Sequence, residues 1–169
     1  LFSLFYQNHP GEHLNVFTRL SHGQYDFQGN YIYTGSQSRD DGIGRWWNME
    51  ARVISIAIEN HKLLTGIEYQ WNPRQDQYAL DPGSGVYSLN APSTSHSSGI
   101  YIQDEITWND SLIFNIGVRH DRYNIQETHT TPRLSAIYKA GAHTTLKALY
   151  GSAFRAPNVH ERLYFPANP

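Results

Sequence analysis

The sequence contains no cysteine among its 169 residues. Disulfide frameworks, thiolate zinc sites and cysteine nucleophiles are therefore excluded. Charge is nearly balanced, with 13 basic and 15 acidic residues, so no overall basic field attracts a nucleic-acid backbone. The sequence also lacks any run of about 18 apolar residues, which excludes a transmembrane helix. A membrane barrel is not excluded, because alternating strands have the average hydropathy of a soluble protein.

Recognisable enzyme motifs are missing as well. Gly83-Ser84-Gly85 lacks the outer glycine of a nucleophile elbow and lies in a Pro/Gly/Ser loop. The nine histidines are scattered, mostly in turns, without the convergent spacing that a metal site requires. We therefore expect no catalysis, no metal site and no cofactor.

Alternation with a period of two residues is what the sequence does contain. In the segment 111–123, Leu112, Phe114, Ile116 and Val118 fall on one face, and Asn115, Arg119 and Asp121 fall on the other. Segments 49–59, 63–71 and 100–108 follow a similar pattern, although Asp104 interrupts the apolar row, and we expect a bulge or an interface position there. With the weaker segments 1–7, 14–27, 133–139 and 145–154, the sequence predicts about eight strands and no helix.

The predicted connections alternate in length along the chain. Short, turn-rich segments occupy 8–12, 59–62, 109–111 and 140–143, whereas longer connections occupy 28–44, 72–98, 125–131 and the region after Arg155. In an antiparallel up-and-down meander, this order places the short turns at one end and the long loops at the other. Outer-membrane barrels have that asymmetry. Trp108 and Tyr138 near the short turns, and Trp46, Trp47 and Trp71 near the long loops, are placed as interfacial aromatic girdles would be.

Four segments resemble those of one known family. The stretch 145–158, with Tyr150-Gly151 leading into Phe154-Arg155-Ala156-Pro157, closely resembles a barrel signature of TonB-dependent outer-membrane receptors. Tyr101-Ile-Gln-Asp-Glu105, Gly117-Val-Arg-His-Asp-Arg-Tyr123 and the strand start Pro132-Arg133-Leu134 are similar to further strands of the same family. Residues 47–69 also look like one of its hairpins.

This resemblance implies an all-β fold: an open segment, residues 1–169, of a transmembrane barrel of about 22 strands whose lumen is closed by a plug. The plug, the remaining strands and the segment that engages TonB would lie outside this chain. We therefore expect strands 1–7 and 145–154 each to lack a neighbour. The implied location is the bacterial outer membrane, with membrane lipid and the TonB complex as partners.

The implied function is active import of a ferric siderophore or a similar iron chelate, without covalent chemistry. Arginines suit an anionic chelate and aromatic rings suit a flat one, so loop residues of these types are the candidates for ligand contact. They are Tyr31, Tyr33, Arg39, Arg45, Arg74, Tyr78, His96, Arg155, His160, Arg162 and Tyr164.

Haem is the alternative ligand. Haem receptors of the family have a histidine between the Phe-Arg-Ala-Pro motif and an Asn-Pro box, and His160 and Asn168-Pro169 resemble these elements. Siderophore receptors carry similar segments and the spacing here is short, so we favour a ferric siderophore, with cobalamin or a glycan after haem.

Two other classes of protein remain open. A complete eight-stranded outer-membrane barrel with a structural or adhesive role would need only the predicted strands. A soluble lipocalin-like binder would fill its interior with apolar side chains, which the polar row Asn115, Arg119 and Asp121 disfavours.

Overall fold

The computed structural model describes residues 1–33, 35–125 and 127–164. These residues form nine β-strands and one short helix. The strands are β1 (Phe2–Asn8), β2 (Leu14–Tyr33), β3 (Ser36–Ser55), β4 (His61–Asp81), β5 (Val86–Ala91), β6 (Ser95–Asn109), β7 (Leu112–Tyr123), β8 (His129–Gly141) and β9 (Thr144–Gly151); the helix is α1 (Val159–Tyr164). In this part of the chain no helix is long and apolar enough to cross a membrane.

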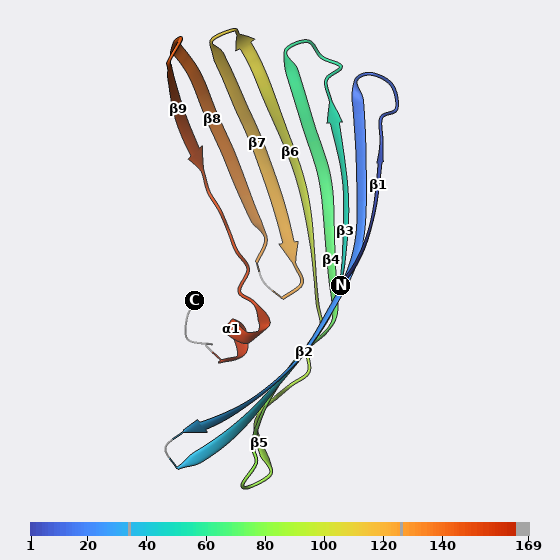
Figure 1. The fold of residues 1–169 in the computed structure, drawn as a ribbon, viewed down its shortest axis with the longest axis vertical. Helices are drawn as coiled ribbons and strands as arrows, with labels where there is room; N and C mark the ends of the chain where they lie inside the picture. Colours follow the sequence, from blue (N-terminus) through green and yellow to red (C-terminus); the bar gives the residue numbers. More distant parts are fainter. Residues whose placement is uncertain (34, 126, 165–169) are drawn as a thin grey trace.

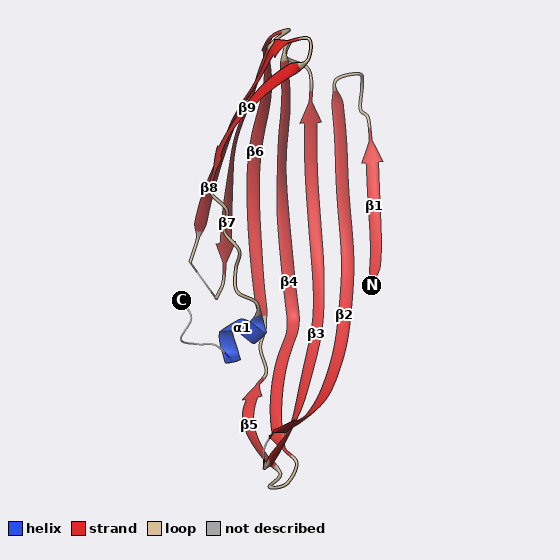
Figure 2. Ribbon diagram, turned by 60° about the vertical axis from the view of Figure 1, so that its left-hand side comes forward, coloured by secondary structure: helices blue, strands red, loops and turns tan. Residues whose placement is uncertain are grey.

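The strands form a single curved, antiparallel sheet in the order β1-β2-β3-β4-β6-β7-β8-β9 (Figures 1 and 2). The predicted meander is therefore confirmed. The turns β1–β2, β3–β4, β6–β7 and β8–β9 all lie at the upper end of Figure 1, as the alternating connection lengths predicted. Within the described residues, β1 pairs only with β2 and β9 only with β8, so the sheet is open.

The predicted long connections 28–44 and 72–98 are wrong as loops, because most of their residues are strand. β2 continues to Tyr33 and β3 begins at Ser36, which pairs with Tyr33, while β4 continues to Asp81 before β5 returns along it. Gly35 and Gly85 have φ angles of +84° and +69° in these hairpin tips, a conformation that favours glycine. The lack of apolar alternation in these segments concealed strands that are held by backbone pairing.

The two faces of the sheet differ in chemistry, and the pairing register shows which residues share a face. Opposed residues on neighbouring strands project to the same side. The convex face carries a continuous apolar set: Leu4, Leu20, Met49, Val53, Leu63, Ile67, Ile102, Ile106, Leu112, Phe114, Ile116, Val118, Leu134, Ala136 and Leu146. Ala79 is the one buried hydrophobic residue among those described. The apolar face thus has no protein layer over it, as expected of a wall in contact with hydrocarbon.

The apolar set ends where Trp47 and Trp71 stand opposite each other. Here the register between β3 and β4 shifts, between Arg45 and Trp47, which indicates a bulge. Beyond this level β2, β3, β4 and β5 form an extension that turns away from the rest of the sheet (Figure 1). We call residues 24–33, 36–45, 74–81 and 86–91 the arm.

Two further expectations need correction. Asp104 lies in regular register opposite Leu63 and Ile116, and the nearby register shift falls at Thr107/Asn109 instead. Its carboxylate is bonded to Nδ1 of His61 at 2.6 Å, so a polar pair rather than a bulge accommodates it. The helix α1 was not expected, since the alternation that reveals strands gives no signal for one short helical turn.

Candidate functional site

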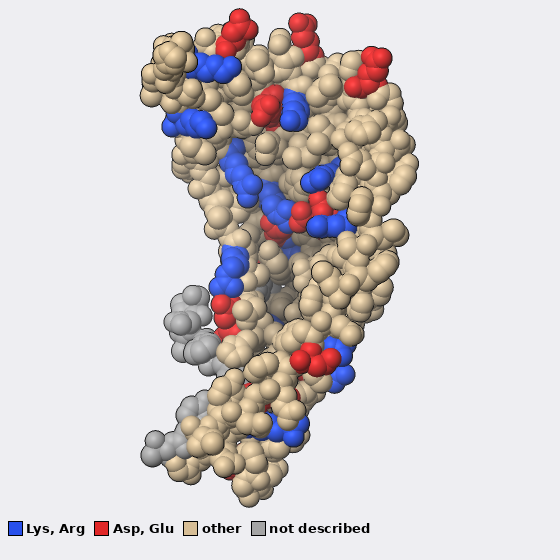
Figure 3. Space-filling model, viewed as in Figure 1, with Lys and Arg blue, Asp and Glu red and all other residues tan. Residues whose placement is uncertain are grey.

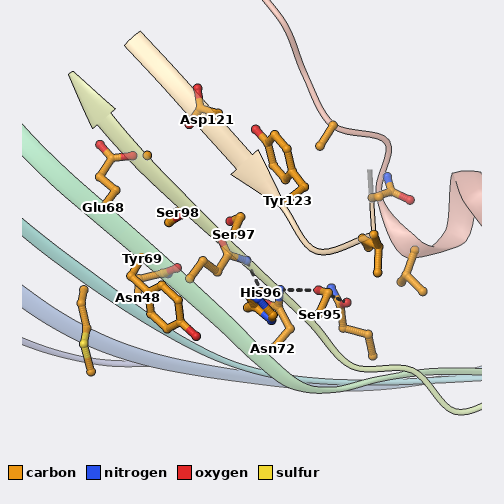
Figure 4. Close-up of a pocket in the computed structure, with 18 of the residues that line it drawn as sticks. Asn48, Glu68, Tyr69, Asn72, Ser95, His96, Ser97, Ser98, Asp121 and Tyr123 are labelled. Atoms are coloured by element: carbon orange, nitrogen blue, oxygen red, sulfur yellow. Dashed lines mark hydrogen bonds between the residues drawn. The ribbon is translucent and has the colours of Figure 1, made fainter. Parts of the chain in front are cut away.

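A hollow of about 560 Å³ lies on the concave face of the sheet. Its wall is formed by strands β2, β3, β4, β6 and β7. The segment 156–162, which follows β9, also borders the hollow. Charged side chains gather in the concavity in Figure 3, and Figure 4 shows the side chains that line the hollow. Its lining includes Arg19, Glu68, Arg119, His96 and Arg162.

Ion pairs dominate the strand side of the hollow. Arg119 donates to both carboxylate oxygens of Asp121, at 2.7 to 3.0 Å, and to Glu68 at 2.7 Å. Arg19 pairs with Glu50 at 2.9 Å, and Arg52 approaches the same carboxylate at 3.7 Å. The wall therefore presents charges that are largely compensated by their neighbours and held in fixed positions.

Gly99 leaves room for the contact between Arg119 and Glu68, which crosses a strand. Glu68 on β4 and Asp121 on β7 are both opposite Gly99 on β6, so Arg119 reaches Glu68 across an intervening strand. A Cβ atom at Gly99 would lie 2.6 Å from Nη2 of Arg119 and 2.6 Å from Oδ1 of Asp121. Any larger residue at this position would thus displace the ion pairs.

A neutral polar network lies at the arm end of the hollow. The Asn72 amide donates to Ser95 Oγ at 2.8 Å, and Ser95 Oγ donates to Oε1 of Gln75 at 2.6 Å. Gln70 donates to Oδ1 of Asn72 at 2.9 Å. Asn72 and Ser95 are buried, and Figure 4 shows their contact beside His96. Because these groups are buried and hydrogen-bonded to one another, they are held in fixed positions next to the bulge in β4.

The segment after β9 is held down by its own side chains. The Phe154 ring stacks on the His129 ring at a centroid distance of 3.4 Å. Asn158 Oδ1 accepts from the Glu161 N–H at 2.9 Å while the Asn158 N–H donates to Glu161 Oε2 at 2.8 Å, which is a reciprocal cap on α1. Arg155 donates to both oxygens of Glu161, at 3.0 and 2.8 Å. The Arg155 guanidinium and the Asn158 N–H hold the pKa of Glu161 below its ordinary value.

Four of the predicted ligand residues, Arg39, Arg45, Arg74 and Tyr78, come together on one face of the arm. The β2–β3 register is unbroken, so this face continues the convex face of the wall. Each cation has a carboxylate: Arg39 pairs with Asp41 at 3.2 Å, Arg45 with Asp26 at 2.9 Å, and Arg74 with Asp76 at 2.5 Å. The Tyr78 hydroxyl also donates to Asp76 at 3.1 Å. Their role in ligand contact stays a prediction.

The other predicted residues are dispersed. Arg162 lines the hollow, and its Nε is buried without a hydrogen-bond partner. His96 borders the hollow along β6, but it stands opposite Trp71, and its ring lies 6.3 Å from that of Tyr69, on the convex face. Tyr31 is part-exposed on the concave side of the arm, Arg155 pairs with Glu161 as described, and His160 lies in α1. Tyr33 ends β2 and Tyr164 ends α1, but their side chains lie outside the described part of the structure.

Sequence reasoning missed most of the hollow. Asn72, Gln75 and Ser95 fall in the segment expected to be a loop, and uncharged amides and hydroxyls give no motif by which to find them. Tyr25 and Phe27 on the arm were also missed. In the described residues no group of three or more histidines and carboxylates is placed to bind a metal ion.

Known proteins share both the sequence pattern and the fold of this chain. The family model described as "TonB dependent receptor-like, beta-barrel" matches residues 2–169. No curated protein sequence matches the chain. Three solved structures share its fold: BauA, the ferric preacinetobactin receptor of Acinetobacter baumannii, with a TM-score of 0.65 and 14% identity; the siderophore receptor PirA of Pseudomonas aeruginosa, with 0.53 and 17%; and the ferric citrate transporter FecA, with 0.57 and 15%. They cover 87%, 94% and 88% of this chain.

The chain belongs to the β-barrel family of TonB-dependent receptors. This is an outer-membrane family of transport receptors, not of enzymes, and the resemblance found in the sequence is confirmed. The chain spans about a third or less of the three solved structures, 29%, 34% and 26% of their lengths. Its open sheet corresponds to part of a barrel wall in such receptors.

Proposed function

We propose that residues 1–169 are part of the barrel domain of an outer-membrane receptor that imports a ferric siderophore with energy supplied through TonB. The observation that carries the proposal is the two-sided wall: a convex apolar face bounded by Trp47 and Trp71, and a concave face lined by fixed charges and buried amides. A wall of this kind separates hydrocarbon from a polar lumen. Plug, TonB-binding segment and remaining strands would belong to the rest of the receptor.

The naming of two similar structures as siderophore receptors and of one as a ferric citrate transporter supports an iron chelate as the ligand. A closed eight-stranded barrel is disfavoured, because within the described residues β1 and β9 each have a partner on one side only. A lipocalin-like interior is disfavoured by the charges of Arg19, Glu50 and Arg119 on the concave face.

The test uses a strain from which the receptor gene has been deleted, complemented with the intact gene. Under iron restriction, uptake of radioactive iron from a panel of ferric siderophores should require both the receptor and a functional TonB. A second complemented strain carries a receptor without the TonB-binding segment as a control for insertion without transport. Uptake of every chelate at equal rates with and without the gene would contradict the proposal.

A further inference from the structure

The concave side of the arm carries a row of aromatic side chains laid over glycines. On β2, Tyr25, Phe27 and Tyr31 share the face of Arg19, because the β2–β3 ladder has no register shift between Leu14 and Tyr33. Trp46 joins them from β3, opposite Gly23. We call Tyr25, Phe27, Tyr31 and Trp46 the aromatic shelf. The shelf therefore continues the surface that lines the hollow.

The glycines show how the rings lie. A Cβ atom at Gly44 would collide with the Tyr25 ring, and one at Gly23 would collide with the Trp46 ring. At Gly29 a Cβ atom would meet the Phe27 and Tyr31 rings at 2.9 and 2.8 Å. The rings of Tyr25 and Trp46 thus lie over Gly44 and Gly23, and the outer ends of the Phe27 and Tyr31 rings meet over Gly29.

The opposite sides of the rings are partly exposed to solvent. Tyr25, Phe27 and Tyr31 are 44%, 48% and 41% exposed. The Tyr25 hydroxyl accepts from the buried Gln77 amide at 3.4 Å, which helps to hold its ring in place. Because the rings are part-exposed and held close to the sheet by the glycines beneath them, they form a surface on which another planar group stacks with little loss of side-chain entropy.

The lack of basic side chains around the aromatic shelf indicates what charge its ligand would carry. The arm's cations, Arg39, Arg45 and Arg74, lie on the other face and are each paired with an aspartate. By register, the described side chains around the shelf are Ser36, Ser38, Asp40, Gln75, Gln77 and Ala79, none of which is basic. A compact polyanion finds no counter-charge here, whereas a neutral ring system finds both stacking area and hydrogen-bonding groups.

We infer that the aromatic shelf is a subsite for the ring portion of a weakly charged, ring-bearing ferric chelate, rather than for a small polycarboxylate. The inference rests on the iron-uptake function proposed above. Chelates with phenolate and oxazoline groups have the required planar, nearly neutral surface. The ligand would meet the shelf first and then the hollow, because the two share one face of β2 and β3.

The experiment uses the full receptor, purified in detergent, and three probes: a ferric phenolate–oxazoline chelate, a ring-free neutral ferric trihydroxamate and ferric citrate. Equilibrium binding is measured for the wild type and for Phe27→Leu, Tyr31→Ala and Ile32→Ala. Phe27→Leu keeps an apolar cover over Gly29 but removes the ring. Ile32 is 83% exposed on the other face of β2, so Ile32→Ala is the matched control for loss of exposed apolar surface.

The wild type should bind the phenolate–oxazoline chelate most tightly. Phe27→Leu and Tyr31→Ala should each weaken this binding about two- to tenfold, the range expected for a lost aromatic pair. Ile32→Ala should leave it unchanged. Tightest binding of ferric citrate, or unaltered affinity of Phe27→Leu for the ring-bearing probe, would overturn the subsite. If the subsite is overturned but iron uptake still depends on the receptor, the proposed transport function stands. Uptake of all three probes without the receptor would reject the transport function itself.

Discussion

The Arg155 guanidinium donates to both carboxylate oxygens of Glu161, which at the same time accepts from the Asn158 N–H. One carboxylate therefore joins the arginine of the Phe-Arg-Ala-Pro motif to the first turn of α1. This contact gives the motif's arginine a structural role in the segment that borders the hollow.

The lowered pKa of Glu161, caused first by Arg155 and then by the Asn158 N–H, makes this contact sensitive to acid. A carboxyl whose folded pKa is depressed stabilises the fold fully above its ordinary value of 4.5, and this contribution disappears as the pH falls through the lowered pKa. The protection factors of the amides in residues 156–162, which are corrected for the intrinsic pH dependence of exchange, should therefore fall in acid more than those of the strands. Glu161→Gln should have low protection factors already at neutral pH, with little further change in acid. An identical acid response in both proteins would contradict this role.

Replacing Gly99 by Val should break the contact of Arg119 with Glu68. The new side chain would occupy the space that the guanidinium crosses, and loss of charge-assisted bonds of this kind costs about 1.5 to 3 kcal/mol, less here because Arg119 is part-exposed. Urea unfolding of the receptor in lipid vesicles measures the change. Gly141→Ala serves as the control, since a Cβ atom at this position would have no neighbouring atom within 4 Å, and it should alter the free energy of unfolding little.

An arginine at position 134 tests the lipid-facing assignment. Leu134 lies between Ile116 and Tyr150 on the convex face and is 45% exposed. Leu134→Arg should destabilise the receptor by about 2 to 4 kcal/mol if this position is near the middle of the membrane. Ile116 is a poorer test, because Asp104 stands opposite it and would give an arginine a partner. Ser135→Arg, on the concave face, should change the free energy of unfolding little. A larger loss for Ser135→Arg than for Leu134→Arg would show that the concave face, not the convex one, contacts lipid.

Removing one partner of the His61–Asp104 pair on the convex face should lower the free energy of unfolding, whereas replacing both partners with apolar residues should lower it much less. Removing only the imidazole with His61→Phe leaves a carboxylate among Leu63, Ile106 and Ile116, with Oδ1 already buried and unbonded. We expect a loss of about 1 to 3 kcal/mol in the free energy of unfolding. Adding Asp104→Leu should recover most of this loss, because an apolar pair suits the surrounding face. A double variant no more stable than His61→Phe would refute this account.

The haem alternative is tested at His160 in α1. If the ligand is a ferric siderophore, His160→Ala should retain nearly normal uptake of iron from it. Haem-supported growth of the wild type, abolished by His160→Ala with receptor levels unchanged, would instead establish haem as the ligand. His143→Ala, in the β8–β9 turn at the opposite end of the sheet, is the control for a general effect of removing a histidine.

Alternation revealed the part of the fold in which one face is apolar. Leu112, Phe114, Ile116 and Val118 share a face as predicted, and the short turns gather at one end. Most of the arm was missed because residues 28–44 are largely polar or glycine, so the alternation that begins at Tyr25 and Phe27 does not continue into an apolar row. The hollow was missed for another reason: Arg119, Gly99 and Glu68 are distant in sequence and meet only through the register of three strands.

The two faces of β2 and β3 exchange character near Trp46 and Trp47 while the ladder itself runs on without a shift. Arm and wall are consequently joined along these two strands by one continuous run of backbone pairing. A ligand on the arm would therefore rest on strands that run, over twenty residues each, from the tip near Gly35 to the opposite end of the sheet.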